Sequence, residues 1–159
     1  ALHIRGLSAL LCGDAEREQM EEHLSGLEED LVAMGKHAHA SWVRVNRIMN
    51  QWHLGNPQVA LQLYHPELRL NPLARAMCTA IVEAARLQCG RGSVPALEHA
   101  LEALAPKLPV RFLELPDLIR AIVLDAPLPW TIEALEAVLP NRSGDVRAAY
   151  RLWTARQSR

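Results

Sequence analysis

The side chains best suited to chemistry in this chain are histidines and cysteines that lie in apolar, helix-like sequence. His37 and His39 could bind a metal ion, but residues two positions apart on a helix do not face the same side, and no third ligand has a suitable spacing. Cys78 and Cys89 could meet a histidine across two helices, but no neighbour in the sequence would activate either thiol. Without a convergent acid, base and nucleophile, we expect no metal, no cofactor and no enzymatic activity.

A glycine-rich segment, Gly90–Ser93, has two alternative interpretations. Free backbone N–H groups at the start of a helix, together with Arg91, could hold a phosphate group. The segment lacks the Lys-Ser or Lys-Thr ending of a phosphate-binding loop. We therefore favour a tight turn between two helices.

Charged residues gather on the outer faces of two predicted helices. The acidic face is interpreted as solvated, with docking of a basic partner as the alternative. The arginine face is interpreted as solvated or in contact with a partner, with a nucleic-acid-binding stripe as the alternative. No aromatic platform or recognition-helix pattern accompanies the arginines, and the net charge is −1, so we expect no direct binding of nucleic acid. The first face carries Glu18, Glu21, Glu22, Glu28, Glu29 and Asp30, and the second carries Arg147, Arg151 and Arg156, with Arg159 following.

The composition favours helices. Of the 159 residues, 50% are hydrophobic and only 4% are aromatic, and alanine and leucine dominate over β-branched residues. The length fits one domain with one core. The three cysteines are odd in number and lie in apolar stretches, and no apolar run is long enough to cross a membrane. We expect a cytoplasmic, all-α protein that has no contact with membranes.

Apolar residues recur at helical spacing, and glycine followed by a capping residue separates these stretches. Met20, Leu24, Leu27 and Leu31 form one such stripe, which Gly35 ends. Glycine fits the left-handed conformation that follows a helix, and Asp, Asn or Ser can cap the next one. Four pairs of this kind predict about eight helices in antiparallel hairpins: Gly13-Asp14, Gly55-Asn56, Gly92-Ser93 and Gly144-Asp145.

One segment, residues 40–72, resembles a tetratricopeptide repeat. A second unit, 73–106, is similar, with Gly90 or Gly92 at its turn, and 2–34 keeps only the apolar spacing. The late alanine of the repeat is replaced by Glu67, and Pro66 interrupts the second helix. The resemblance implies a single domain, 1–159, wound as a right-handed α-α superhelix with irregular helices at 112–157. It rests on Trp42, Leu54-Gly55-Asn56, Ala60-Leu61, Tyr64 and Leu70-Asn71-Pro72.

The resemblance also implies a binding function. Irregular repeats of this kind occur in large bacterial ATP-dependent LuxR-type transcriptional activators and in type III secretion chaperones. We expect a scaffold for transcription regulation or protein interaction that holds a peptide, a helix or another domain of the same protein. Its groove would be lined by polar residues that face away from the apolar stripes of two helices: Arg44, Arg47, Asn50, Gln51, Arg75, Thr79, Glu83 and Arg86.

A sensory domain for a small effector is the alternative from a different class. Trp42, Trp52 or Trp130 would then line a cavity for the effector. Ordinary packing of the tryptophans in a core is the simpler interpretation, and we favour it. A type III secretion-type chaperone is the second alternative.

Overall fold

The computed structural model describes residues 14–158, with side chains from residue 18 onward. This part of the chain contains eight α-helices and no strand, which confirms the all-α prediction. The predicted first helix, Cys12 and the Gly13 turn lie outside the described residues. The helices are α2 (Asp14–Ala33), α3 (His37–His53), α4 (Pro57–Leu63), α5 (Pro72–Gln88), α6 (Val94–Leu104), α7 (Leu115–Leu124), α8 (Ile132–Val138) and α9 (Gly144–Gln157).

Three glycines end helices in the left-handed conformation. Gly35, Gly55 and Gly90 have φ angles of 73°, 83° and 74°, and they follow α2, α3 and α5. In each case the next residue donates its N–H to a carbonyl five positions earlier, as Asn56 does to Gln51 at 2.9 Å. Asp125, with φ 55°, has the same backbone conformation after α7. The predicted stops at Gly35 and Gly55 are confirmed.

Two of the predicted glycine turns were wrong in detail. Gly92 does not have a left-handed φ. A side chain is disfavoured at this position because a Cβ would lie 2.8 Å from the backbone nitrogen of Leu87. Gly144 ends no helix but is the first residue of α9, which Ser143 caps by accepting a hydrogen bond from the N–H of Val146 at 3.3 Å.

The predicted helix starts differ in how they are capped. Ser93 and Thr131 accept the N–H of the residue three positions later, at 3.2 Å and 3.1 Å, as predicted. Asn56 precedes α4 but makes no side-chain cap; its amide donates instead to Gln51 Oε1 at 3.1 Å. Pro57 occupies the first turn, where its missing N–H costs no hydrogen bond.

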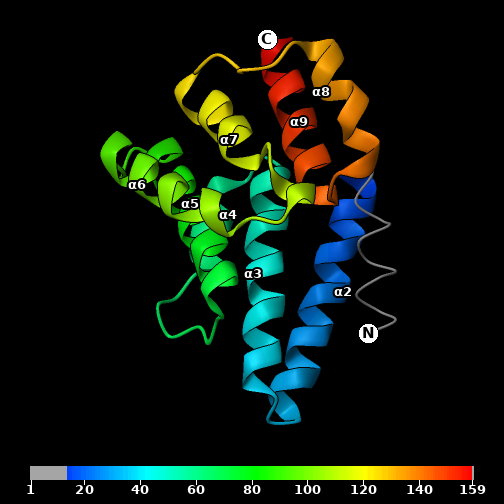
Figure 1. Cartoon of the computed structure of the whole chain (residues 1–159). Coiled ribbons are helices and arrows are strands. Elements are labelled where there is room, and N and C mark those ends of the chain that lie inside the picture. Colours follow the sequence, from blue (N-terminus) through cyan, green and yellow to red (C-terminus); the bar gives the residue numbers. More distant parts are fainter. Residues whose placement is uncertain (1–13, 159) are drawn as a thin grey trace.

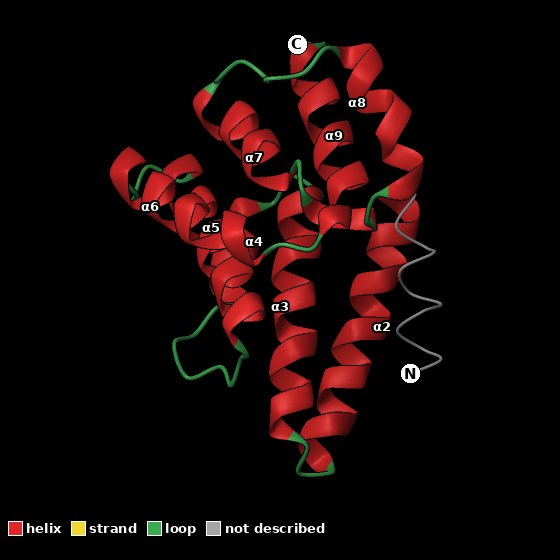
Figure 2. Ribbon diagram, viewed as in Figure 1, coloured by secondary structure: helices red, strands yellow, loops and turns green. Residues whose placement is uncertain are grey.

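Successive helices pack against one another. The α2–α3 hairpin is the longest feature of the fold and projects from the remaining helices (Figure 1). Beyond it, α3 packs on α4 and α5, α5 packs on α6 and α7, and α7 packs on α6 and α9. Figure 2 shows these helices joined by short loops, apart from longer connections such as residues 64–71 between α4 and α5.

The main core runs through α3 to α9 and excludes most of α2. Its largest fully buried side chains include Trp52, Ile81, Leu101 and Ile119, which come from four different helices. A smaller apolar cluster of Met20, Leu24 and Val43 joins α2 to α3. Leu27 and Leu31 are partly buried against this cluster. The hairpin is thus held by an apolar cluster separate from the main core, together with polar contacts.

The last helix returns to the first part of the core. His53 at the end of α3 is buried, and its Nε2 lies 3.3 Å from Asp145 Oδ1 in the first turn of α9. This contact joins residues 92 positions apart in the chain. No helix within residues 14–158 combines the length and apolar character that a membrane crossing requires.

Candidate functional site

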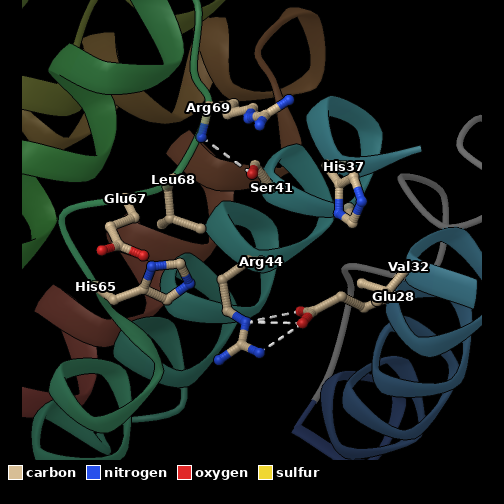
Figure 3. Close-up of a pocket in the computed structure, with 10 residues that line it drawn as sticks. Glu28, Val32, His37, Ser41, Arg44, His65, Glu67, Leu68 and Arg69 are labelled. Atoms are coloured by element: carbon tan, nitrogen blue, oxygen red, sulfur yellow. Dashed lines mark hydrogen bonds and ion pairs between the residues drawn. The ribbon is translucent and has the colours of Figure 1, made fainter. Parts of the chain in front are cut away.

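A cleft of about 320 Å³ opens between the α2–α3 hairpin and the loop that follows α4. Figure 3 shows its walls, which come from the second half of α2, the first half of α3 and residues 65–69. Its volume lies at the lower end of the range of small-ligand pockets, about 300–1,000 Å³. The residues that line it are Glu28, Val32, His37, Ala40, Ser41, Arg44, His65, Glu67, Leu68 and Arg69.

The floor of the cleft is an ion-pair network between α2 and α3. Arg44 donates to both carboxylate oxygens of Glu28, with Nε 2.8 Å from Oε1, and also to the carbonyl of Leu63 at 3.2 Å. Arg47, one turn later on α3, donates to Glu28 at 3.2 Å and to Glu21 at 2.8 Å. Glu28 is therefore shared by two guanidinium groups, and the network joins α2, α3 and the end of α4.

The network holds Glu28 in its charged form. Burial by itself would raise the pKa of Glu28, but the hydrogen bonds and positive charges of Arg44 and Arg47 hold this pKa below its ordinary value. The same contacts with Glu21 and Glu28 outweigh burial at Arg47 and raise the pKa of its guanidinium. Glu28 and Arg47 therefore both stay ionised at neutral pH.

The rim of the cleft carries polar side chains that make no hydrogen bond or ion pair within the described residues. Within residues 18–158, the side chains of His37, His65, Glu67 and Arg69 form no hydrogen bond or ion pair, and all four residues are exposed. Ser41 is buried at the centre, where its Oγ accepts the N–H of Arg69 at 3.0 Å. These side chains are available to a ligand.

The predicted groove residues of α3 have three different environments. Arg44 lines the cleft, whereas Arg47 is engaged with Glu21 and Glu28 behind it. Asn50 and Gln51 were expected to face away from the core, but they are buried, with 2% and 8% of their surface exposed. They face inward because the second half of α3 is covered by neighbouring helices, including α4, α5 and α9.

The predicted groove residues of α5 form a separate surface. Arg75 donates to the carbonyl of Leu68 at 3.1 Å, and Thr79 donates to the carbonyl of Arg75 at 2.8 Å. Glu83 pairs with Arg86 at 2.6 Å, and Arg86 lies over the ring of Tyr64. None of the four lines the cleft. The structure therefore does not bring the α3 and α5 sets together on this surface.

None of the three tryptophans named for an effector cavity lines this cleft. Trp52 is buried in the core, and its Nε1 donates to Gln88 Oε1 at 2.8 Å. Trp42 is exposed on α3, and Trp130 is half-buried against the core before α8. Trp52 lies within the main core and Trp130 packs against it, as the packing interpretation expects.

The other chemistry-bearing residues fall in unremarkable places. Within the described part of the chain, no three His, Cys, Asp or Glu side chains are arranged to hold a metal ion. Cys78 and Cys89 are both free thiols, and burial raises the pKa of Cys78 to about 11, which disfavours the reactive thiolate.

Sequence reasoning missed Glu28 as part of a site and assigned it to a solvated face. A signal was present: Glu21 and Glu28 are seven positions apart, and Arg44 and Arg47 are three apart, so each pair shares one helix face. When the two helices of a hairpin carry opposite charges on the faces that meet, those charged side chains form ion pairs.

The chain was compared with known proteins at the levels of family, sequence and structure. No family model, curated protein or solved structure matches it. The geometry of the cleft is therefore the basis for assigning a function.

Proposed function

We propose that this chain is a helical-repeat binding module that holds a segment of a partner protein in the cleft between α2, α3 and residues 65–69. The observation that carries this proposal is the cleft itself, whose rim presents four polar side chains that form no hydrogen bond or ion pair within residues 18–158. Such groups fix the orientation of a ligand, while Val32, Ala40 and Leu68 offer apolar contact. The partner is either a separate protein or another domain of the same one.

The repeat character of the fold supports a scaffold role. Three of the left-handed residues, at positions 55, 90 and 125, are separated by two equal steps of 35 residues, close to the period of about 34 in tetratricopeptide repeats. Gly35, which ends α2, lies 20 residues before Gly55 and falls outside this spacing. They follow α3, α5 and α7, and these three helices pack in sequence, α3 on α5 and α5 on α7. We infer a tetratricopeptide-like stack of α3 with α4, α5 with α6, and α7 with α9.

This stack differs from a simple open solenoid, in which each repeat contacts only its neighbours. The contact of α9 with α3 joins the last unit to the first, and α8 is inserted before α9. The ion pairs of Glu28 with Arg44 and Arg47 fix α2 against this stack. A cleft with pre-organised walls loses less entropy on binding than a flexible one, which favours a specific partner.

A peptide selection with matched variants tests the proposal. Peptides that bind the purified chain are selected from a random library, and their affinity is measured for the parent chain, Val32→Trp and Val59→Trp. Val32 lines the cleft and is 48% exposed, so an indole there obstructs it without entering the core. Val59 is a comparable valine on α4, 38% exposed and outside the cleft.

We expect Val32→Trp to weaken binding by about tenfold or more, equivalent to at least 1.4 kcal/mol, and Val59→Trp to leave it unchanged. Selected peptides that bind both variants equally well would place the binding surface elsewhere. A selection that yields no binder would contradict a peptide-binding role.

A further inference from the structure

We propose that the cleft recognises a carboxylate, presented as an acidic side chain of the partner segment. This inference rests on the proposed function and names the chemistry that the cleft selects. It follows from the imbalance between hydrogen-bond donors and acceptors that remain available in the cleft.

The hydrogen-bond donors that remain available to a ligand lie together on one side of the cleft. In Figure 3, the side chain of Arg69 extends above Ser41, and His37 lies to the right of Ser41. The guanidinium of Arg69 has no acceptor in residues 18–158. The Ser41 oxygen accepts the backbone N–H of Arg69, and the Ser41 hydroxyl hydrogen has no acceptor among the same residues, so it can donate to a ligand. A planar guanidinium with a nearby hydroxyl donor is well matched to a carboxylate.

The acidic residues of the cleft do not oppose this assignment. Glu28 and Glu21 are balanced by Arg44 and Arg47, so this network presents no net negative charge to a ligand. Glu67 lies on the other side of the cleft, beside His65 (Figure 3). The first turn of α3, next to His37, contains no acidic residue, so the positive end of this helix is not neutralised by its own side chains.

The neighbouring apolar surface favours a peptide ligand that carries both an acidic and an apolar residue. Val32 and Leu68 lie on opposite walls, on α2 and on the loop before α5. An acidic residue with an apolar neighbour would place its carboxylate near Arg69 and its neighbour against one of these walls. A free inorganic anion would use only the charged part of the cleft.

The test uses two probes that differ in one group, acetyl-Leu-Glu-Leu-amide and acetyl-Leu-Gln-Leu-amide. Their affinities are measured by following backbone amide signals of the full chain in NMR titrations, with inorganic phosphate as a third probe. The variant Arg69→Gln removes the proposed partner of the carboxylate, and it should fold because the Arg69 side chain is exposed. Arg91→Gln is the matched control, since Arg91 is an exposed arginine on the α5–α6 turn, outside the cleft.

We expect the glutamate peptide to bind about tenfold more tightly than the glutamine peptide, because a charge-assisted hydrogen bond is roughly twice as strong as a neutral one. This preference should disappear in Arg69→Gln and persist in Arg91→Gln. Equal affinities, a preference that survives in Arg69→Gln, or failure of both peptides to bind would overturn the inference. So would binding of phosphate without binding of the glutamate peptide.

The outcome separates this inference from the proposed function. Library peptides that bind in the cleft through neutral residues alone would overturn the carboxylate assignment and leave the partner-binding role standing. Peptides that bind elsewhere would overturn the proposed function.

Discussion

Glu28 on α2 and Arg44 on α3 form a two-pronged ion pair, with Arg44 Nε 2.8 Å from Glu28 Oε1 and Nη2 bonded to Oε2. The pair forms the floor of the cleft and joins a helix that contributes little to the main core. The ion pair therefore ties the α2 wall of the cleft to the α3 wall.

Replacing Glu28 should destabilise the protein. In Glu28→Gln the two guanidinium groups lose their shared carboxylate, and we expect the free energy of unfolding to fall by about 1.5–3 kcal/mol, the range for hydrogen bonds to charged groups. Urea denaturation measures the change. Glu29→Gln, at an exposed position on the same helix, should change stability by less than about 0.5 kcal/mol. Equal effects of the two substitutions would contradict the structural role of the ion pair.

The stabilisation from Glu28 should depend on pH. Its pKa is lower in the folded protein than the ordinary value of 4.5, so the contribution is complete above this value. It is lost as the pH falls through the lowered pKa, because the protonated acid no longer pairs with arginine. The stability difference between the parent chain and Glu28→Gln should be constant near neutral pH and shrink in acid below about 4.5. A stability difference that grows as the pH falls would contradict this prediction.

Two glycines should respond in opposite directions to alanine. Gly26 lies inside α2, is exposed, and has no atom within 4 Å of an added Cβ, so Gly26→Ala should stabilise the protein by about 0.5–1 kcal/mol. Gly55 has a φ of 83°, and Gly55→Ala should destabilise by about 1–2 kcal/mol. Thermal unfolding of both variants checks the prediction, which fails if both shift the melting temperature in the same direction.

Much of the fold could be predicted from the sequence because its signals are local. Apolar periodicity and the glycines at 35 and 55 locate α2 and α3, and Ser93 and Thr131 mark the starts of α6 and α8. The start of α9 was misjudged because Ser143 and Asp145 are both good caps on either side of Gly144. Only the backbone geometry distinguishes them.

The site was less predictable because it depends on tertiary contacts. Arg44 and Arg47 were correctly placed away from the apolar stripe of α3, but their partners, Glu28 and Glu21, are on another helix. Asn50 and Gln51 are polar and yet buried, since Gln51 accepts a hydrogen bond from Asn56 and neighbouring helices cover this part of α3. Helix periodicity alone gives no information on such neighbours.

The two tryptophans of α3 should differ sharply in their structural roles. Trp52 is 1% exposed and fills the core, so Trp52→Ala should cost about 3–5 kcal/mol. Trp42 is 39% exposed, and Trp42→Ala should cost far less. Chemical denaturation gives both values. Similar losses would indicate that Trp42 is covered by a contact that the fold does not show.

The most direct test of the binding cleft is a map of the backbone amide signals that shift when a library-selected peptide is added to the full chain. We predict the largest shifts in the second half of α2, the first half of α3 and residues 65–69, which together form the cleft. Shifts centred instead on Arg75, Thr79, Glu83 and Arg86 of α5, with none in the cleft, would contradict the account.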